Sequence, residues 1–324
     1  MRRVSVAILG VVVVASLALG LAAGTVPLSP GQVWDGLWRG DSSAGVIVRD
    51  LRAPRVLLAF AVGGSLAVCG AALQAMIRNP LAEPYLLGLS GGAGLGAVLA
   101  IASQATGPWA VPLAAFAGAI AAIALVYRLS LVAGRRLDPR VLLLSGVVVG
   151  SFAGALMSAI IVLSPAAGIR NAFLWLLGGF GASSWRSLAV FTAYAALPMA
   201  TIGLSARHLD LLALGDETAH HLGADVDRTR RTIYICTALL TAASVATCGI
   251  IGFVGLVVPH AVRTVARPLH RTLLPLVFIA GGAFLVLSDV VSRTVVRPLE
   301  LPVGVITALV GVPLFAVLLR RTLA

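Results

Sequence analysis

Residues 206–231, ARHLDLLALGDETAHHLGADVDRTRR, form the longest polar stretch of a chain that is otherwise apolar. The stretch holds four Arg, five acidic residues and three His, and long uncharged runs flank it on both sides. Asp216 can cap a short helix and Gly223 can end it, because Gly adopts the left-handed conformation that a helix stop needs. Asp227 can then cap the next helix. The stretch therefore predicts helix, turn and helix, either as a docking element or as a plain solvated loop.

The composition places the chain among membrane proteins. It has 324 residues, of which 59% are hydrophobic and only 11% charged, and its mean hydropathy is +1.03. The net charge of +12 comes from Arg alone, since the chain contains no Lys. These Arg lie in short clusters between apolar runs, as membrane topology requires, so we expect no nucleic-acid partner. The three Cys lie in or beside apolar runs without metal-ligand spacing, which predicts buried thiols and no metal site.

The apolar runs predict an all-α, polytopic membrane protein that forms one transmembrane domain over residues 1–324. About 20 apolar residues are needed for each helical crossing. The uncharged run from Pro84 to Tyr127 is too long for one crossing, and Gly107-Pro108 divides it into two. The ten predicted spans are 4–23, 56–77, two within 84–127, 141–163, 188–205, 232–249, a short one ending near 266, 272–287 and 303–319. Shorter helices are expected after the capping box Ser29–Gln32 and within residues 169–180.

The distribution of Arg predicts the orientation. Ten spans with an inner N-terminus place 16 of the 24 Arg on the inner side, together with residues 206–231. This excess agrees with the positive-inside rule, predicts that both termini are cytoplasmic, and puts the polar stretch within reach of a soluble ATPase. The sixteen are Arg2, Arg3, Arg78, Arg128, Arg135, Arg136, Arg140, Arg207, Arg228, Arg230, Arg231, Arg263, Arg267, Arg271, Arg320 and Arg321.

Small residues at four-residue spacing predict close helix packing, notably at Gly88, Gly92 and Gly96 and at Gly146, Gly150, Gly154 and Ser158. Ionisable residues are nearly absent from the centres of the spans. Gln74 and Asp289 lie near span ends, and His260 is expected at a helix start after Pro259, so each is interpreted as a local contact rather than a proton relay.

Seven short motifs resemble one family, the FecCD-type permeases of ABC importers, over residues 49–324. The resemblance implies the type II importer fold: about ten helices per subunit, in a complex of two permease and two ATP-binding subunits. It implies a ferric siderophore, haem or cobalamin as cargo, delivered by a periplasmic or lipid-anchored binding protein, and location in the inner membrane. The motifs are LRAPR (51–55), NPLAEP (79–84), LGLSGGA (87–93), WLLGG (175–179), ALGDE (213–217), GFVGLVVPH (252–260) and ELPVG (300–304).

The resemblance also assigns roles to residues. The spacing Glu217-x-Ala219-x-x-x-Gly223 is similar to the loop that couples such permeases to their ATPase, with Thr218 in place of an Ala. The coupling helices are expected over residues 207–227, with contacts from Leu214, Gly215, Asp216, Glu217, Ala219, Leu222 and Gly223. Arg52, Arg55 and Arg293 are expected to pair with Glu of the binding protein. Asn79, Pro80 and Leu81 are expected at the cytoplasmic gate.

A Walker A loop needs a Lys, so this chain without Lys is expected to be no ATPase itself and to bind no cofactor; ATP and Mg²⁺ belong to the partner. The second permease subunit is expected to be another copy of the chain, although a heterodimer stays open. Two other classes also stay open. An ion-gradient-driven secondary transporter would need ionisable groups at mid-span, and a membrane-bound enzyme would need a polar cluster, for which His220, His221, Asp216 and Glu217 are the candidates.

Overall fold

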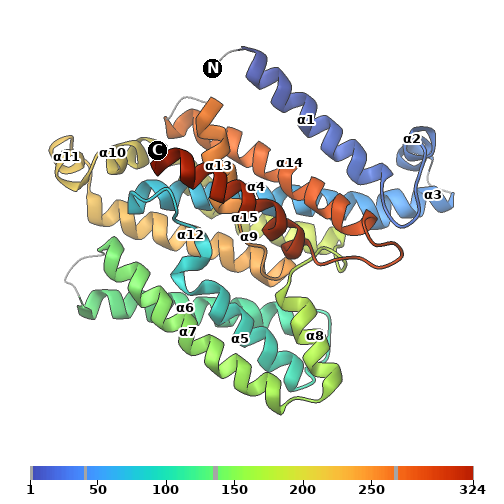
Figure 1. The fold of residues 1–324 in the computed structure, drawn as a ribbon, viewed down its shortest axis with the longest axis horizontal. Helices are drawn as coiled ribbons and strands as arrows, with labels where there is room; N and C mark the ends of the chain where they lie inside the picture. The colour runs from blue at the N-terminus through green and yellow to red at the C-terminus, as the bar shows by residue number, and fades with distance from the viewer. Residues whose placement is uncertain (1–2, 40–41, 134–137, 266–268, 324) are drawn as a thin grey trace.

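The computed structural model describes residues 3–39, 42–133, 138–265 and 269–323, and within these ranges the chain is helical without a strand (Figure 1). Arg2, Arg135, Arg136 and Arg267, which entered the predicted orientation, lie outside the described residues. Ten apolar helices follow the order of the ten predicted spans: α1 (Arg3–Ala22), α4 (Ala53–Ile77), α5 (Leu89–Ala102), α6 (Ala110–Ala133), α7 (Pro139–Leu163), α9 (Trp185–Leu204), α12 (Val226–Cys248), α13 (Val254–Val265), α14 (His270–Thr294) and α15 (Val303–Leu323).

Short helices join these spans. The capping box is confirmed, since the Ser29 hydroxyl accepts from the Gln32 amide and the Gln32 side chain accepts from the Ser29 amide. The short elements are α2 (Pro30–Trp38), α3 (Ser43–Val46), the π-helix η1 (Ile47–Arg52), the 3-10 helix η2 (Pro84–Leu87), α8 (Ala166–Leu176), α10 (Ala206–Ala213) and α11 (Asp216–His221).

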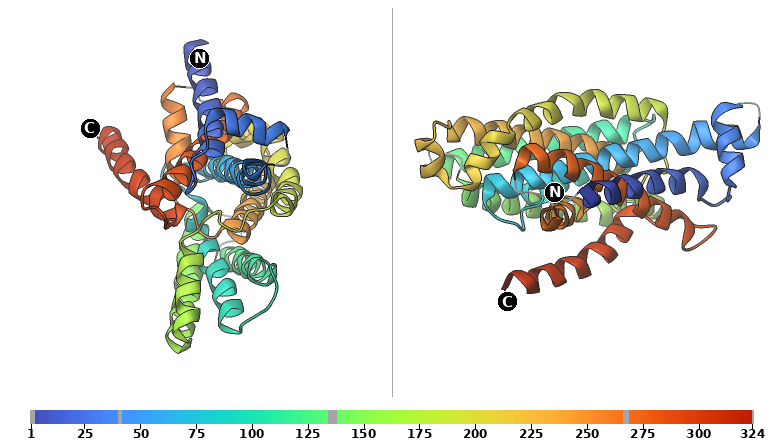
Figure 2. Two further views of the ribbon diagram at one scale, coloured as in Figure 1. Left: turned by 90° about the vertical axis from the view of Figure 1, so that its right-hand side faces the viewer. Right: turned by 90° about the horizontal axis from the view of Figure 1, so that it is seen from above.

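Helix α4 lies at the centre of the bundle, as the view along the long axis shows (Figure 2). Its partners approach so closely that Gly is required at the contacts. A Cβ at Gly63 would lie 2.4 Å from the carbonyl oxygen of Gly281 on α14, and one at Gly70 would lie 1.8 Å from that of Gly255 on α13. Backbone-to-backbone contact of this kind replaces the hydrophobic drive that lipid does not supply.

The predicted glycine faces have mixed outcomes. Gly92 and Gly96 of α5 pack on α6, and Gly146 of α7 packs on Leu86 and Leu87 of η2. A Cβ added at any of these three Gly would lie less than 3 Å from an atom of the facing element. Gly154, in contrast, has no neighbour from this chain within 4 Å of an added Cβ, so its packing stays a prediction. Further along the same helix, Met157 again approaches Gly94 of α5.

The segment between α12 and α13 differs from the prediction in one respect. The break is confirmed: Gly249 has φ 72°, and the next helix begins at Val254. Pro259 and His260, however, lie inside α13 rather than at its start. Helix α14 also runs on to Thr294, so Asp289 and Arg293 are helical residues within it.

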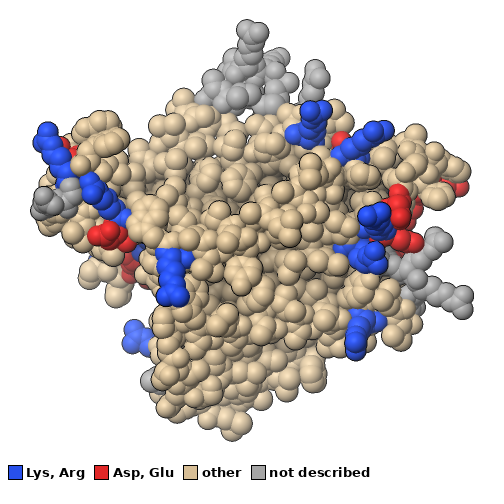
Figure 3. Space-filling view, turned by 180° about the vertical axis from the view of Figure 1, so that it is seen from behind, with Lys and Arg blue, Asp and Glu red and all other residues tan. Residues whose placement is uncertain are grey.

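Charged side chains gather at the two ends of the helix bundle, with a broad uncharged band between them (Figure 3). Helices α10 and α11 project at one end of the long axis, and α2 and α3 lie at the other (Figures 1 and 2). The width of the uncharged band follows the length of the apolar helices, so the band is the part of the surface suited to a membrane. Trp34 and Trp38 are exposed on α2, where an interfacial aromatic residue is expected.

Candidate functional site

The polar stretch forms two short helices and their turns, residues 206–225, which we call the polar hairpin. Leu209 and Leu212 of α10 are fully buried against the bundle, and Ala219 of α11 is fully buried as well. Leu214 and Leu222, in contrast, are 63% and 56% exposed. The hairpin therefore anchors itself by one apolar side and leaves two large apolar side chains uncovered on the other.

Gly223 ends α11, as predicted. It has φ 83°, its amide donates to the carbonyl of His220 (2.9 Å), and the Ala224 amide donates to that of Ala219 (2.9 Å). This pair of bonds is the Schellman pattern, which satisfies the last carbonyls of a helix. The predicted start caps are wrong: α11 follows Gly215 without a side-chain cap, and Asp225, not Asp227, caps α12 by accepting from the Arg228 amide (3.0 Å).

Asp216 does not cap α11; its carboxylate forms ion pairs instead. Its Oδ1 lies 2.6 Å from Nη2 of Arg230, a buried side chain of α12, and 3.7 Å from Nη2 of Arg78. Arg78 immediately follows α4 and adopts the left-handed conformation (φ 55°). The carboxylate thus connects α11 to the end of α4.

A second carboxylate of the hairpin holds another core helix. Oδ1 of Asp210 on α10 accepts from the His270 amide at 2.9 Å and lies 2.6 Å from its Nδ1. His270 is the first residue of α14 and is buried. Sequence reasoning missed Asp210 and His270, since nothing in their spacing pairs them across 60 residues.

The hairpin carries little sign of an enzyme centre. The rings of His220 and His221 are 6.3 Å apart at their centroids and inclined by 55°, and Asp216 is directed to Arg230 instead. In the part of the chain that the structure describes, no three His, Cys, Asp or Glu side chains gather as a metal site.

Residues 78–83 form an irregular connection between α4 and η2, as the two Pro predicted. The Asn79 Oδ1 accepts from the Leu81 amide at 2.9 Å, and Leu81 is 39% exposed at the tip. The connection is attached to the α12–α13 break, because the Glu83 carboxylate accepts from the Phe253 amide at 2.9 Å. Burial raises the pKa of Glu83. Gln74, behind the connection, binds the carbonyls of Gly255 (3.3 Å) and Leu256 (3.4 Å).

At the opposite end, five charged residues meet in what we call the charge cluster: Arg52, Arg55, Asp289, Arg293 and Glu300. Nη2 of Arg55 lies 2.9 Å from Oδ1 of Asp289 and 2.8 Å from Oε2 of Glu300. Nε of Arg293 lies 3.0 Å from Oδ2 of Asp289 and donates to the backbone carbonyl of the same residue at 3.3 Å. Asp289 is fully buried, which confirms its interpretation as a satisfied local contact.

Arg52 and Arg293 bind the C-terminal carbonyls of α1, where a cation is favoured. Nη1 of Arg52 donates to Leu21 (2.8 Å) and Ala22 (2.7 Å), and the Arg293 guanidinium donates to Gly20 and Ala23, each at 3.1 Å. Only 5% of Arg52 and 3% of Arg293 is exposed. Both guanidinium groups are thus engaged by this chain, and their predicted docking role stays a prediction.

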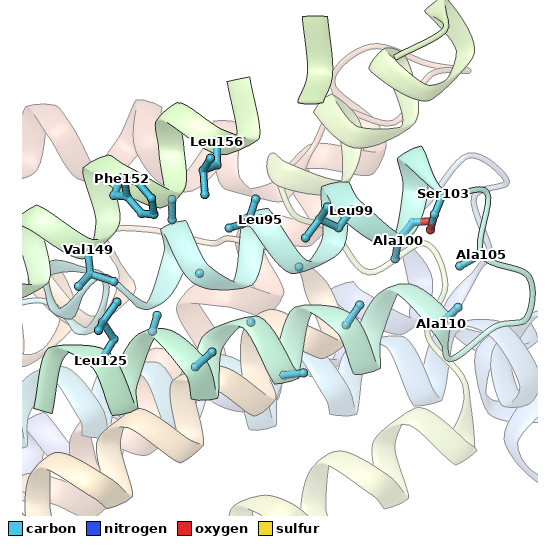
Figure 4. A pocket seen from close by; sticks show the side chains of 18 residues that line it. Leu95, Leu99, Ala100, Ser103, Ala105, Ala110, Leu125, Val149, Phe152 and Leu156 are labelled. Carbon is cyan, nitrogen blue, oxygen red and sulfur yellow. The ribbon is translucent and has the colours of Figure 1, made fainter. Parts of the chain in front are cut away.

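A groove of about 890 Å³ runs between α5, α6 and α7 (Figure 4). Leu95 and Leu99 of α5 face Phe152 and Leu156 of α7 across it, and small residues of α6 form its floor. Its lining is almost wholly apolar, and no motif in the sequence marked it, since apolar residues of this kind occur on every span.

Comparison with known proteins agrees with this architecture. The model of the FecCD transport family matches residues 11–321. The cobalamin import system permease protein BtuC of Halobacterium salinarum is 46% identical over 86% of this chain and 74% of its own length. The vitamin B12 import system permease protein BtuC of Escherichia coli O157:H7 is 39% identical over 97% and 94%. The solved structure of an inward-facing, putative metal-chelate type ABC transporter is 29% identical, covers 97% of both chains and gives a TM-score of 0.87.

Proposed function

Because the chain belongs to the FecCD transport family, we propose that it is the membrane-spanning subunit of an ATP-driven importer that carries a corrinoid such as cobalamin. The carrying observation is the polar hairpin at one end of an apolar ten-helix bundle with the fold of type II ABC importer permeases. The relatives named for cobalamin import favour this cargo over a siderophore or haem.

The energy source in this proposal is a separate ATPase that docks on the polar hairpin. The chain contains no Lys, so it cannot form a Walker A loop. Leu214 and Leu222 are exposed apolar anchors beside Glu217, which suits a buried docking contact with a charged rim. This assignment places the hairpin and both termini in the cytoplasm.

The cargo path lies between two copies of the chain. The core helices touch at glycines, which leaves no room for a large chelate inside one subunit. Helices α7 and α15 expose rows of apolar side chains, among them Val147, Val148 and Phe152 on α7 and Leu309 and Val312 on α15. A second copy would cover these faces around a two-fold axis, with residues 79–81 near that axis as the gate.

The binding protein docks at the opposite end, and Arg55 is its contact in the charge cluster. Glu300, which is partly exposed, shares the Arg55 guanidinium with buried Asp289. A carboxylate of the binding protein can replace Glu300 there without opening the core. Arg52 and Arg293 support this contact by fixing the end of α1 beneath it.

The test is uptake into proteoliposomes that contain the chain, its ATPase and its binding protein. We expect ATP-dependent accumulation of cyanocobalamin, with ferric siderophores and haem taken up poorly. Uptake that follows an ion gradient without ATP would support the secondary transporter instead. Preference for a siderophore or haem would retain the importer and correct the cargo.

A further inference from the structure

Two core helices, α4 and α14, contact each other through ionic groups and through their backbones. At the charge cluster, Arg55 of α4 binds Asp289 of α14 with Nη2–Oδ1 at 2.9 Å. Further along, Gly63 and Gly281 bring the two backbones together, and Phe278 of α14 packs over Gly64. Helices α4 and α14 therefore pack as a pair from the charge cluster to the middle of the bundle.

The polar hairpin holds both members of this pair at their other end. Asp210 of α10 binds the first residue of α14, His270, through its amide and its ring. Asp216 of α11 reaches Arg78 at the end of α4. One carboxylate thus faces each helix, and the two lie six residues apart on the same hairpin.

The contact with Arg78 is steric as well as ionic. A Cβ at Gly215 would lie 3.1 Å from Nη1 of Arg78, so the guanidinium rests on the backbone that precedes α11. Asp216 is itself fixed from behind by Arg230, at 2.6 Å, whose side chain is buried in α12. A displacement of α11 therefore acts on Arg78 through a supported carboxylate rather than through a free side chain.

Arg78 is also directly connected to the proposed gate. It closes α4 in the left-handed conformation, with its amide donating to the Ala75 carbonyl at 3.3 Å, and Asn79, Pro80 and Leu81 follow it without an intervening element. A displacement of the Arg78 side chain would therefore act directly on the residue at which the loop begins.

We propose that Arg78 is the positioning residue through which the polar hairpin moves residues 79–81, with Asp216 as its contact on α11 and Asp210–His270 as a second joint that moves α14 in step. This inference rests on the proposed function, and it adds the joint by which a docked ATPase would act on the gate. The joint transmits position and contributes little to stability, because an ion pair this exposed is weak.

The experiment uses the complete transporter in proteoliposomes with Arg78→Gln, Arg78→Lys and Arg39→Gln. Arg39→Gln is the matched control, because it removes an exposed Arg–Asp pair (Arg39–Asp35, 3.5 Å) at the opposite end. We expect Arg78→Gln to lower cobalamin uptake per ATP hydrolysed about fivefold or more, within the range of ordinary coupling energies. Arg78→Lys should restore most of the uptake, and Arg39→Gln should match the parent.

A readout without cargo separates this inference from the proposed function. The native thiols at Cys69, Cys236 and Cys248 are buried, so a Cys at position 81 can be labelled selectively with a maleimide. In the parent background, Leu81→Cys should change its labelling rate with nucleotide, and Arg78→Gln should abolish that change. A nucleotide response that persists in Arg78→Gln, or equal uptake per ATP, overturns the joint.

Failure of the parent to import cobalamin, with the labelling response intact and Arg78-dependent, would overturn the cargo and keep the joint. Asp216→Asn removes the contact with Arg78 from the other partner, together with the pair to Arg230, and serves if Arg78→Gln does not assemble. In the Arg78→Gln/Asp216→Asn double variant the loss should not exceed that of Asp216→Asn alone, because Asp216→Asn already removes the contact that Arg78→Gln removes. Additive losses would count against the joint.

Discussion

The two charged ends of the bundle use their ionic groups in opposite ways. In the charge cluster, Asp289 is buried between Arg55 and Arg293, and the guanidinium of Arg293 contacts one carboxylate and three backbone carbonyls. In the polar hairpin, ion pairs hold only the inner side, and Leu214 and Leu222 stand uncovered. The charge cluster is satisfied within the chain, whereas the polar hairpin leaves large apolar side chains exposed.

The two ends differ in the interactions that a partner would have to displace in order to dock. At the charge cluster, docking must exchange one carboxylate for another, so the contact is selective and sensitive to salt. At the hairpin, docking covers apolar side chains that water already surrounds, so contact is favourable without exchange. A transient complex therefore suits the charge cluster, and a stable complex suits the polar hairpin.

We expect the largest effect from removing the buried carboxylate of the charge cluster. Asp289→Ala leaves Arg55 and Arg293 without their shared carboxylate in a buried site, which should cost about 3–5 kcal/mol of stability. Thermal unfolding of the detergent-solubilised protein measures it. The control is Asp35→Ala, an exposed partner of Arg39, where about 0–1 kcal/mol is expected. Equal losses in the two variants would show that the cluster is not closed.

We expect the second largest effect from a change in the turn at Gly223 in the polar hairpin. Gly223→Pro removes the amide that donates to His220 and forbids φ 83°, since Pro fixes φ near −65°. We expect transport per ATP to fall about thirtyfold, within the range of coupling energies, while the transporter still assembles. Gly223→Asn should behave almost like the parent, because Asn tolerates the left-handed conformation. Normal uptake and normal cargo-stimulated ATPase activity in Gly223→Pro would remove the hairpin from coupling.

Exchange at the charge cluster should produce a smaller, salt-dependent effect. Arg55→Gln should weaken binding-protein affinity about fivefold at low salt, and Glu300→Gln should strengthen it, because it removes the competing carboxylate. Both changes should shrink at high salt, since charges are screened over about 10 Å at 0.1 M. Equilibrium binding to the complex in nanodiscs measures the affinity. A weaker complex with Glu300→Gln would argue that Glu300 itself contacts the partner.

We expect the smallest effect from the loop of residues 79–81, which follows α4 at the end that carries the polar hairpin. Leu81→Cys should crosslink to its dimer mate in one nucleotide state about threefold more than in the other, as a loop near a two-fold axis that moves with nucleotide would. Val148→Cys on the exposed face of α7 is the control. If only the control crosslinks, the constriction should be sought at residues 138–141.

The sequence predicted the fold well because membrane spans are set by local composition. Ten spans, the Gly107-Pro108 division and the break at Gly249 all follow from short-range signals that lipid enforces. The prediction for Pro259 is wrong because local sequence does not show that the hydrogen bond missing at a Pro can be tolerated inside a membrane helix such as α13. The turn at Gly223 was predicted because a positive φ is a property of one residue.

The site was less predictable because its contacts join distant parts of the chain. The docking role of Arg52, Arg55 and Arg293 stays a prediction, and the two carboxylates that pair with Arg55, Asp289 and Glu300, lie more than 230 positions from it in the sequence. Their competition for one guanidinium depends on packing, as does the burial of Arg52. Likewise, the position of Asp216 in the sequence predicts a helix cap. Its ion pairs form only because α12 and the end of α4 lie close to it in the fold.

The glycine contact between α4 and α14 also limits the kinds of motion available to the protein. A methyl group at Gly63 or Gly281 would clash with the facing helix, so the two backbones are in direct contact at this point. Contact this close resists displacement of one helix along the other, because most side chains would not fit into the same space. In a conformational change of the proposed transporter, we therefore expect the pair to rotate as one body about its helix ends rather than to shear.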